Sequence, residues 1–179
     1  GLFGLLSSFQ LMGRQKSIHI YGPQLLKEVL DFYSEYFAQH QDYKIHFHAV
    51  GTKKFQKIAE DRGLEIYSFP LKHRAPTCGF VFREKQAEMN IKKEIIEKYN
   101  PGIRQIVDIK KGRDLVLDDG SYIPNKELTL APWKPRAYAY CSDTAYYPRI
   151  SEYLKDVDLL YHEATFAPED EELASDTMH

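Results

Sequence analysis

Imidazole and carboxylate side chains stand where several expected strands end. They are His73 after SFPLK, Asp143 after YAYCS, His162 and Glu163 after DLLY, and His179. Strand ends at the open edge of an α/β layer are where such folds place their sites. Because zinc accepts imidazole nitrogen together with carboxylate oxygen, this set suggests a metal site. Each residue alone is weaker evidence, since a single histidine at a strand end is more often satisfied by a backbone hydrogen bond.

Two other histidines, His46 and His48, are spaced like a pair of metal ligands. They lie inside an expected strand, residues 43–50, in which side chains alternate between the two faces. Both rings are therefore expected on one face. Packing or surface exposure explains them better than metal binding.

Helices and strands alternate along the chain and would position these residues. Six segments are short and rich in β-branched or aromatic residues, as strands are: residues 17–23, 43–50, 64–71, 78–84, 136–144 and 157–165. An apolar stripe predicts a helix over residues 23–40, and residues 1–13 are typical of an amphipathic helix. Residues 113–124 predict a hairpin that turns at Asp119 and Gly120. This order predicts an α/β layered domain.

The composition is that of one globular domain, with 43% hydrophobic and 28% charged residues in 179. The net charge of −2 gives no global reason to bind a polyanion. Cys78 and Cys141 are too far apart for a CxxC pair, which favours a reducing compartment such as the cytoplasm. No apolar run approaches the ~20 residues that a membrane span needs.

Positive charge gathers between Arg83 and Arg113. This segment holds nine Lys or Arg residues against five Asp or Glu residues, so the rest of the chain carries a net −6. A solvated helix over residues 87–100 explains the charge by itself, and an arm that contacts phosphates is the alternative. Pro101 and Gly102 are expected to end that helix. Four cations follow closely: Arg104, Lys110, Lys111 and Arg113.

Five motifs, in this order, resemble ribonuclease Z, the transfer-RNA 3′-end endonuclease of the metallo-β-lactamase superfamily. They are GLFGLLSSFQLMGR with IYGP, then HRAPTCGF, YCSDT, YHEATF and ASDTMH. The resemblance implies an α/β fold, a metallo-β-lactamase-like αββα sandwich. It implies a single domain over residues 1–179, incomplete at both ends, with a substrate-binding arm inserted at about 83–113.

The resemblance also implies a zinc-dependent endoribonuclease that removes the 3′ trailer from precursor transfer RNA and leaves a 3′-hydroxyl. Asp143 would bridge two zinc ions and His73 would bind one of them. The family's His-x-His-x-Asp-His cluster and its last ligand histidine, which this sequence lacks, would complete both sites, so this chain alone is expected to be inactive. His179 would stabilise the transition state or protonate the leaving oxygen. His162 and Glu163 would support their loop.

The implied partners are precursor transfer RNA, gripped through its phosphates by Arg104, Lys110, Lys111 and Arg113, and a second copy of the chain. The apolar residues of segment 1–13 would form the homodimer contact. Two other functions stay open: a hydrolase of the same fold that acts on a small ester or thioester, and a non-catalytic RNA-binding or dimerising module. An unrelated α/β domain would not explain the ordered motifs.

Overall fold

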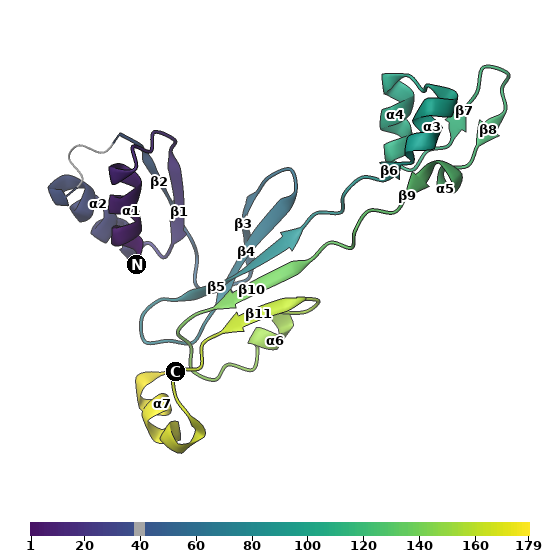
Figure 1. Cartoon of the computed structure of the whole chain (residues 1–179). Coiled ribbons are helices and arrows are strands. Elements are labelled where there is room, and N and C mark those ends of the chain that lie inside the picture. The colour runs from purple at the N-terminus through teal and green to yellow at the C-terminus, as the bar shows by residue number, and fades with distance from the viewer. Residues whose placement is uncertain (38–41) are drawn as a thin grey trace. The chain divides into compact units, whose positions relative to one another are not determined.

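The computed structural model of the chain describes residues 1–37 and 42–179 and divides into two compact units (Figure 1). The first unit comprises residues 1–61, 65–83 and 137–179, and the second comprises residues 62–64 and 84–136. The architecture is mixed α/β with a central sheet, as the sequence predicts. The helix predicted over residues 23–40 is present as far as Phe37, and its last three positions lie outside the described residues.

The first unit contains a five-stranded sheet with the order β11-β10-β5-β4-β3. Its strands are β3 (Gln56–Glu60), β4 (Leu64–Pro70), β5 (Cys78–Glu84), β10 (Ala137–Cys141) and β11 (Leu159–His162). The β10–β11 pair is parallel, whereas β10 runs antiparallel to β5 and β3 runs antiparallel to β4. The sequence predicts four of these strands. It misses β3, whose short segment QKIAE carries one β-branched residue and a register irregularity between Lys57 and Ala59.

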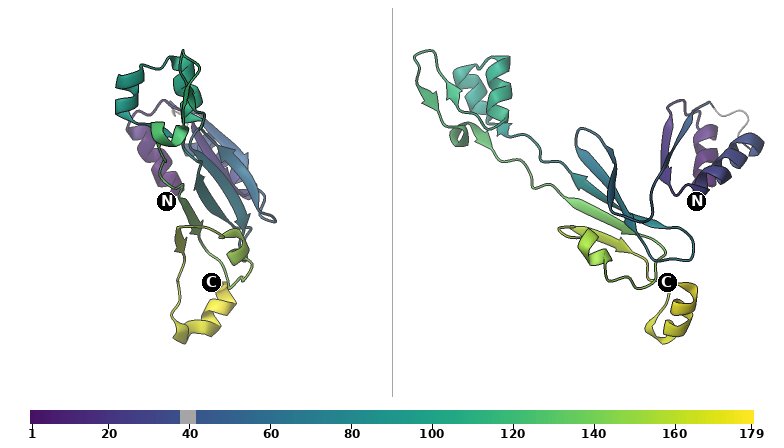
Figure 2. Two further views of the ribbon diagram at one scale, coloured as in Figure 1. Left: turned by 90° about the vertical axis from the view of Figure 1, so that its right-hand side faces the viewer. Right: turned by 180° about the vertical axis from the view of Figure 1, so that it is seen from behind.

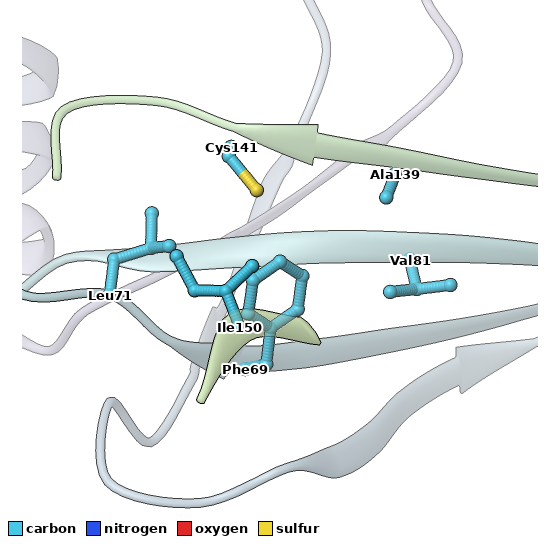
Figure 3. Close-up of a cluster of buried hydrophobic side chains, with 6 residues drawn as sticks. All are labelled: Phe69, Leu71, Val81, Ala139, Cys141 and Ile150. Carbon is cyan, nitrogen blue, oxygen red and sulfur yellow. The ribbon is translucent and has the colours of Figure 1, made fainter. Parts of the chain in front are cut away.

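The core of this sheet gathers around the ring of Phe69, which is fully buried (Figure 3). Side chains from β5 and β10 and from the short helix α6 (Ile150–Tyr153) surround it: Val81, Ala139, Cys141 and Ile150, together with Leu71. A Cβ atom at Gly79 would lie 2.3 Å from the Phe69 ring. Position 79 therefore has to be glycine for the ring to approach the β5 backbone this closely.

A second, smaller core joins the parallel strands β1 (Ile18–Gly22) and β2 (Ile45–Ala49) to two helices. Helices α1 (Leu2–Leu11) and α2 (Leu25–Phe37) lie on the same side of this strand pair (Figure 2). Leu6 and Leu30 bring the helices into contact with Ile20, and the Tyr43 hydroxyl donates a 2.7 Å hydrogen bond to the Leu6 carbonyl oxygen.

The other face of this strand pair carries histidines. The rings of His46 and His48 each stack on the ring of His19, so both share one face as the strand alternation predicts. His46 is exposed and His48 half-buried, in agreement with packing and exposure.

The second unit is built from short elements around Ile109, Leu115 and Leu128. It comprises β6 (Asn90–Ile91), α3 (Lys93–Tyr99), α4 (Ile103–Lys110), β7 (Leu115–Val116), β8 (Tyr122–Ile123), α5 (Asn125–Leu128) and β9 (Thr129–Leu130). The hairpin is confirmed, with β7 paired to β8 and Gly120 at a φ of 82°. The helix predicted over residues 87–100 is wrong at its start, because Asn90 and Ile91 pair with β9 instead.

Two more helical segments follow β11 in the first unit: a 3₁₀ turn, η1 (Pro168–Asp170), and α7 (Glu171–Thr177). Among the helices that the structure describes, none combines the length and the apolar character needed to span a bilayer.

Replacing Gly79 with alanine is expected to lower the free energy of unfolding by about 1–3 kcal/mol, because the added methyl group overlaps the Phe69 ring. Urea denaturation of the purified chain measures this loss. Gly63→Ala is the matched control, since a Cβ atom there meets no heavy atom within 4 Å. Equal stability of the two variants would contradict the packing of Phe69 on Gly79.

Candidate active site

The carboxyl ends of β10 and β11 bring the predicted carboxylates together. These strands are parallel, so their ends meet at one edge of the sheet, where Asp143 follows β10 and Glu163 follows β11. His179 joins them, and each of these three residues offers a potential ligand atom within 4.8 Å of the other two. We call Asp143, Glu163 and His179 the site cluster. The ring of His73, in the loop after β4, lies 5.3 Å from that of His179, centroid to centroid.

Thr144 is the buried residue that joins the loops around the site cluster. Its backbone N–H donates a 2.7 Å hydrogen bond to Glu163 Oε1, and its hydroxyl accepts one of 3.1 Å from the Lys72 N–H. The Ala145 N–H donates in turn to the Lys72 carbonyl oxygen at 2.7 Å. The loops after β4, β10 and β11 are therefore held in one arrangement, which fixes the Glu163 carboxylate.

His179 reaches the cluster because the chain reverses after α7. Met178 adopts the left-handed conformation with a φ of 65°, and the His179 N–H donates to the Ala174 carbonyl oxygen at 2.9 Å. Arg74 ties the helix to the loop that carries His73 by donating to the Asp176 carbonyl oxygen at 2.9 Å. The His73 and His179 rings are held near each other by these backbone contacts.

The Glu163 carboxylate orients the His179 ring. Its two oxygens lie 2.8 and 3.0 Å from Nδ1, which donates the hydrogen bond because a carboxylate can only accept. The Thr165 hydroxyl also donates to Oε2. Burial alone would raise the pKa of Glu163, but the hydrogen bonds from Thr165, Thr144 and His179 outweigh it and lower the pKa from 4.5 to about 2. With Nδ1 engaged, Nε2 of His179 is the nitrogen left to exchange a proton.

The donors of the cluster differ in how well they suit a metal ion. Asp143 is exposed, and its carboxylate has no hydrogen-bond or ion-pair partner within the part of the chain that the structure describes. Glu163 is already occupied by the three donors described above. His73 Nδ1 accepts a long, 3.3 Å hydrogen bond from the Ala75 N–H. This weak bond would be lost if Nε2 bound a metal ion, because Nδ1 would then carry the ring proton. Within the site cluster, the Asp143 carboxylate is therefore the group open to a cation, whereas Glu163 serves the loops and His179; His73 is not a member of this cluster.

The other predicted residues lie elsewhere. His162 is exposed at the end of β11, and its Nδ1 donates a 2.7 Å bond to the Glu163 carbonyl oxygen, so it braces its own loop. The four cations predicted to contact RNA belong to the second unit and are exposed: Arg104, Lys110, Lys111 and Arg113. Arg113 forms an ion pair of 3.1 Å with Asp108. Lys110 and Lys111 line a hollow of about 390 Å³.

Sequence reasoning missed Thr144 and Thr165 as partners of Glu163. Both belong to the quoted motifs YCSDT and YHEATF, but nothing in their spacing shows that one contributes a backbone N–H and the other a hydroxyl.

A further hollow of about 330 Å³ beside His179 is lined by Lys72, Tyr146 and residues of α7. It offers room for a substrate next to the imidazole.

Comparison with known proteins gives a consistent result. The chain is 41% identical over all 179 residues to "Ribonuclease Z" of Phocaeicola vulgatus and to that of Bacteroides thetaiotaomicron, covering 58% and 57% of their lengths. It is 33% identical to "Ribonuclease Z" of Cytophaga hutchinsonii over 180 aligned positions. The chain thus spans a little under three fifths of these relatives. No protein-family model matches it.

The fold agrees with a solved structure. All of the chain superposes on 57% of human tRNase Z, short form, with a TM-score of 0.61 and 18% sequence identity. This likeness confirms the metallo-β-lactamase-like α/β fold that the sequence motifs predict.

Replacing Glu163 with glutamine is expected to destabilise the chain by about 1–3 kcal/mol at pH 7, because charge-assisted hydrogen bonds to a half-buried carboxylate are lost. The pKa of Glu163 is lower in the folded state, so its contribution is complete above about pH 4.5 and disappears as the pH falls through about 2. The gap between the wild-type and variant unfolding free energies should therefore close across this window.

Urea denaturation at a series of pH values measures that gap. Glu172→Gln, which changes an exposed carboxylate of α7, is the control and should show no comparable closure. A gap that stays constant from pH 5 to pH 2 would contradict the role given to the carboxylate.

Proposed function

We propose that the protein is a metal-dependent endoribonuclease acting on precursor transfer RNA. The premise is that all 179 residues of this chain are homologous to part of ribonuclease Z. Cleavage would remove the 3′ trailer and leave a 3′-hydroxyl on the transfer RNA. One observation supports this chemistry most directly. The Asp143 carboxylate, which has no hydrogen-bond partner among the residues that the structure describes, has an oxygen within 4.8 Å of an imidazole nitrogen of His179, whose ring is oriented by a third residue.

Asp143 and His73 would hold metal, which we propose to be zinc, with two ions per subunit completed by ligands outside this chain. Bound zinc activates water and offsets negative charge on phosphate oxygens. His179 would act from its Nε2, donating a proton to the leaving oxygen or a hydrogen bond to the phosphate. Glu163 keeps the proton of the ring on Nδ1 and fixes the orientation of the ring. Thr144 and Thr165 keep Glu163 in place.

The second unit would bind the RNA away from the cut. Arg104, Lys110 and Lys111 are exposed, and their ammonium or guanidinium groups have no hydrogen-bond or ion-pair partner among residues 1–37 and 42–179. Contacts from such groups to phosphates position an RNA without reading its bases, which suits an enzyme that accepts many transfer RNAs. Arg113 is partly neutralised by Asp108 and would contribute less.

Assembly and location complete the proposal. Leu11 and Met12, at the end of α1, are 88% and 71% exposed, which supports a homodimer contact through residues 1–13.

Cys78 and Cys141 are buried, unpaired thiols, and burial raises the pKa of Cys141 to about 11. Unreactive free thiols agree with a reducing, cytoplasmic location.

His179→Ala is expected to lower kcat for precursor cleavage about 10²–10⁴-fold, the range for loss of a general acid, with little change in precursor binding. Gel analysis of precursor cleavage by the active protein with added zinc measures kcat. A binding titration measures the affinity for precursor. The exposed His46 supplies the control variant, His46→Ala, which should retain activity. Hydrolysis of a small thioester without any cleavage of precursor would favour the alternative hydrolase, and binding without cleavage would favour a non-catalytic module.

Replacing Lys110 and Lys111 together with glutamine is expected to weaken precursor binding and to lower the slope of log affinity against log salt by about one unit per lost phosphate contact. Filter binding at several salt concentrations measures the slope. Lys93→Gln with Lys98→Gln, two exposed cations of α3, is a charge-matched comparison and should have a smaller effect. Equal effects of the two pairs would mean that only total charge matters, which would contradict a specific contact.

A further inference from the structure

The single tryptophan of the chain, Trp133, is 94% exposed. It lies in the extended segment of residues 131–136, where Pro132 and Pro135 flank the Trp133–Lys134 pair. Proline fixes its own φ and favours extended backbone in the residue before it, so this segment is stiff. A rigid segment therefore exposes a large, mainly apolar ring to solvent. In this position the ring gains none of the free energy that burial of its surface would provide.

The base of this segment is anchored by an ion pair. The Arg136 guanidinium contacts both carboxylate oxygens of Glu84, with distances of 2.6–3.2 Å, and the Arg136 N–H donates to Glu84 Oε2 at 2.9 Å. Together with Trp133 and Lys134, these two residues line a hollow of about 410 Å³. The indole therefore forms one wall of a recess that also contains cationic groups.

Pro132 connects this hollow along the chain with a second one of the same unit. Pro132 lines the 390 Å³ hollow that Lys110 and Lys111 also line, and it is bonded directly to Trp133. Two exposed ammonium groups and an exposed indole thus belong to hollows that are lined by consecutive residues of one segment. Cations spaced beside an aromatic ring are the arrangement with which proteins bind a nucleic-acid strand, the cations on phosphates and the ring on a base.

We propose that Trp133 is an RNA-binding residue that stacks on the exposed face of a nucleobase, while Lys110 and Lys111 contact neighbouring phosphates. This inference rests on the proposed function for the nature of the ligand. It adds to that function a base-stacking contact, which is insensitive to base identity because each base has a π-face. The contact would supply affinity that salt does not screen, in contrast to the lysines.

Fluorescence gives a direct test, because the emission of the chain at tryptophan-selective excitation comes from Trp133 alone. Titration with precursor transfer RNA is expected to quench this emission, since stacking brings the indole against a base. Inorganic polyphosphate is the control probe, because it offers phosphates without bases and should bind to the lysines with little quenching. Equal quenching by both probes, or none by RNA at saturating concentration, would overturn the stacking contact.

Variants provide the second test. Trp133→Ala is expected to weaken RNA binding about 5-fold or more without changing the salt slope, and Trp133→Phe should recover most of the loss. Tyr122→Ala, which removes another exposed aromatic ring of the same unit (66% exposed), is the matched control and should leave affinity unchanged. Because Trp133 packs against little protein, the thermal midpoints of all variants should agree with that of the parent chain.

These measurements separate the inference from the proposed function. Precursor binding that is strong and salt-dependent but indifferent to Trp133→Ala would overturn the inference and leave the function standing. Quenching by RNA, together with no cleavage of precursor by a protein that carries the completed metal site, would support the inference and count against the function. Loss of self-association in Trp133→Ala, measured by sedimentation with RNA affinity unchanged, would assign the ring to a protein interface and overturn the proposal.

Discussion

The carboxylate of Glu163 is the group on which the arrangement of the site depends. It accepts hydrogen bonds from a backbone N–H after β10, from a hydroxyl on its own loop and from the imidazole of His179. The loop after β10, the loop that carries Glu163 itself and the residue that follows α7 by two positions therefore converge on two oxygen atoms. These hydrogen bonds favour the ionised carboxylate and lower the pKa of Glu163 to about 2. Asp143, beside it, has no such donors among the residues that the structure describes, and its carboxylate is open to a ligand.

Four of the five strands of the central sheet were predictable from the sequence because their signals are local, whereas β3 was missed. Runs such as CGFVFRE and RAYAYCSDT carry enough β-branched and aromatic residues to predict β5 and β10. Parallel pairing of β10 with β11 then brings the residues that follow them to one edge, which is why Asp143 and Glu163 could be expected near each other. The ordered motifs added a resemblance to ribonuclease Z, in line with the 41% identity to proteins of that name, and a fold that agrees with the solved structure.

The parts that could not be predicted depend on tertiary contacts. Strands β6 and β9 have two residues each and exist because they pair with one another, so no local pattern predicts them. Helix α4 carries the polar residues of the expected arm, and its apolar residue Ile109 is recognisable as core only once Leu115 and Leu128 are in place. The return of His179 to the cluster depends on a left-handed Met178, a conformation that methionine seldom adopts and that sequence alone does not indicate.

The second unit leaves and rejoins the sheet at neighbouring positions. Arg83 of β5 lies opposite Ala137 of β10 in the antiparallel register, and the Glu84 N–H donates to the Arg136 carbonyl oxygen at 2.9 Å. Topologically, the unit is an enlarged loop of a hairpin. The entropic cost of closing such a loop rises only with the logarithm of its length. The size of the second unit therefore has little effect on the stability of the sheet. Evolution could therefore enlarge, shrink or exchange the unit without altering the frame that holds the site cluster.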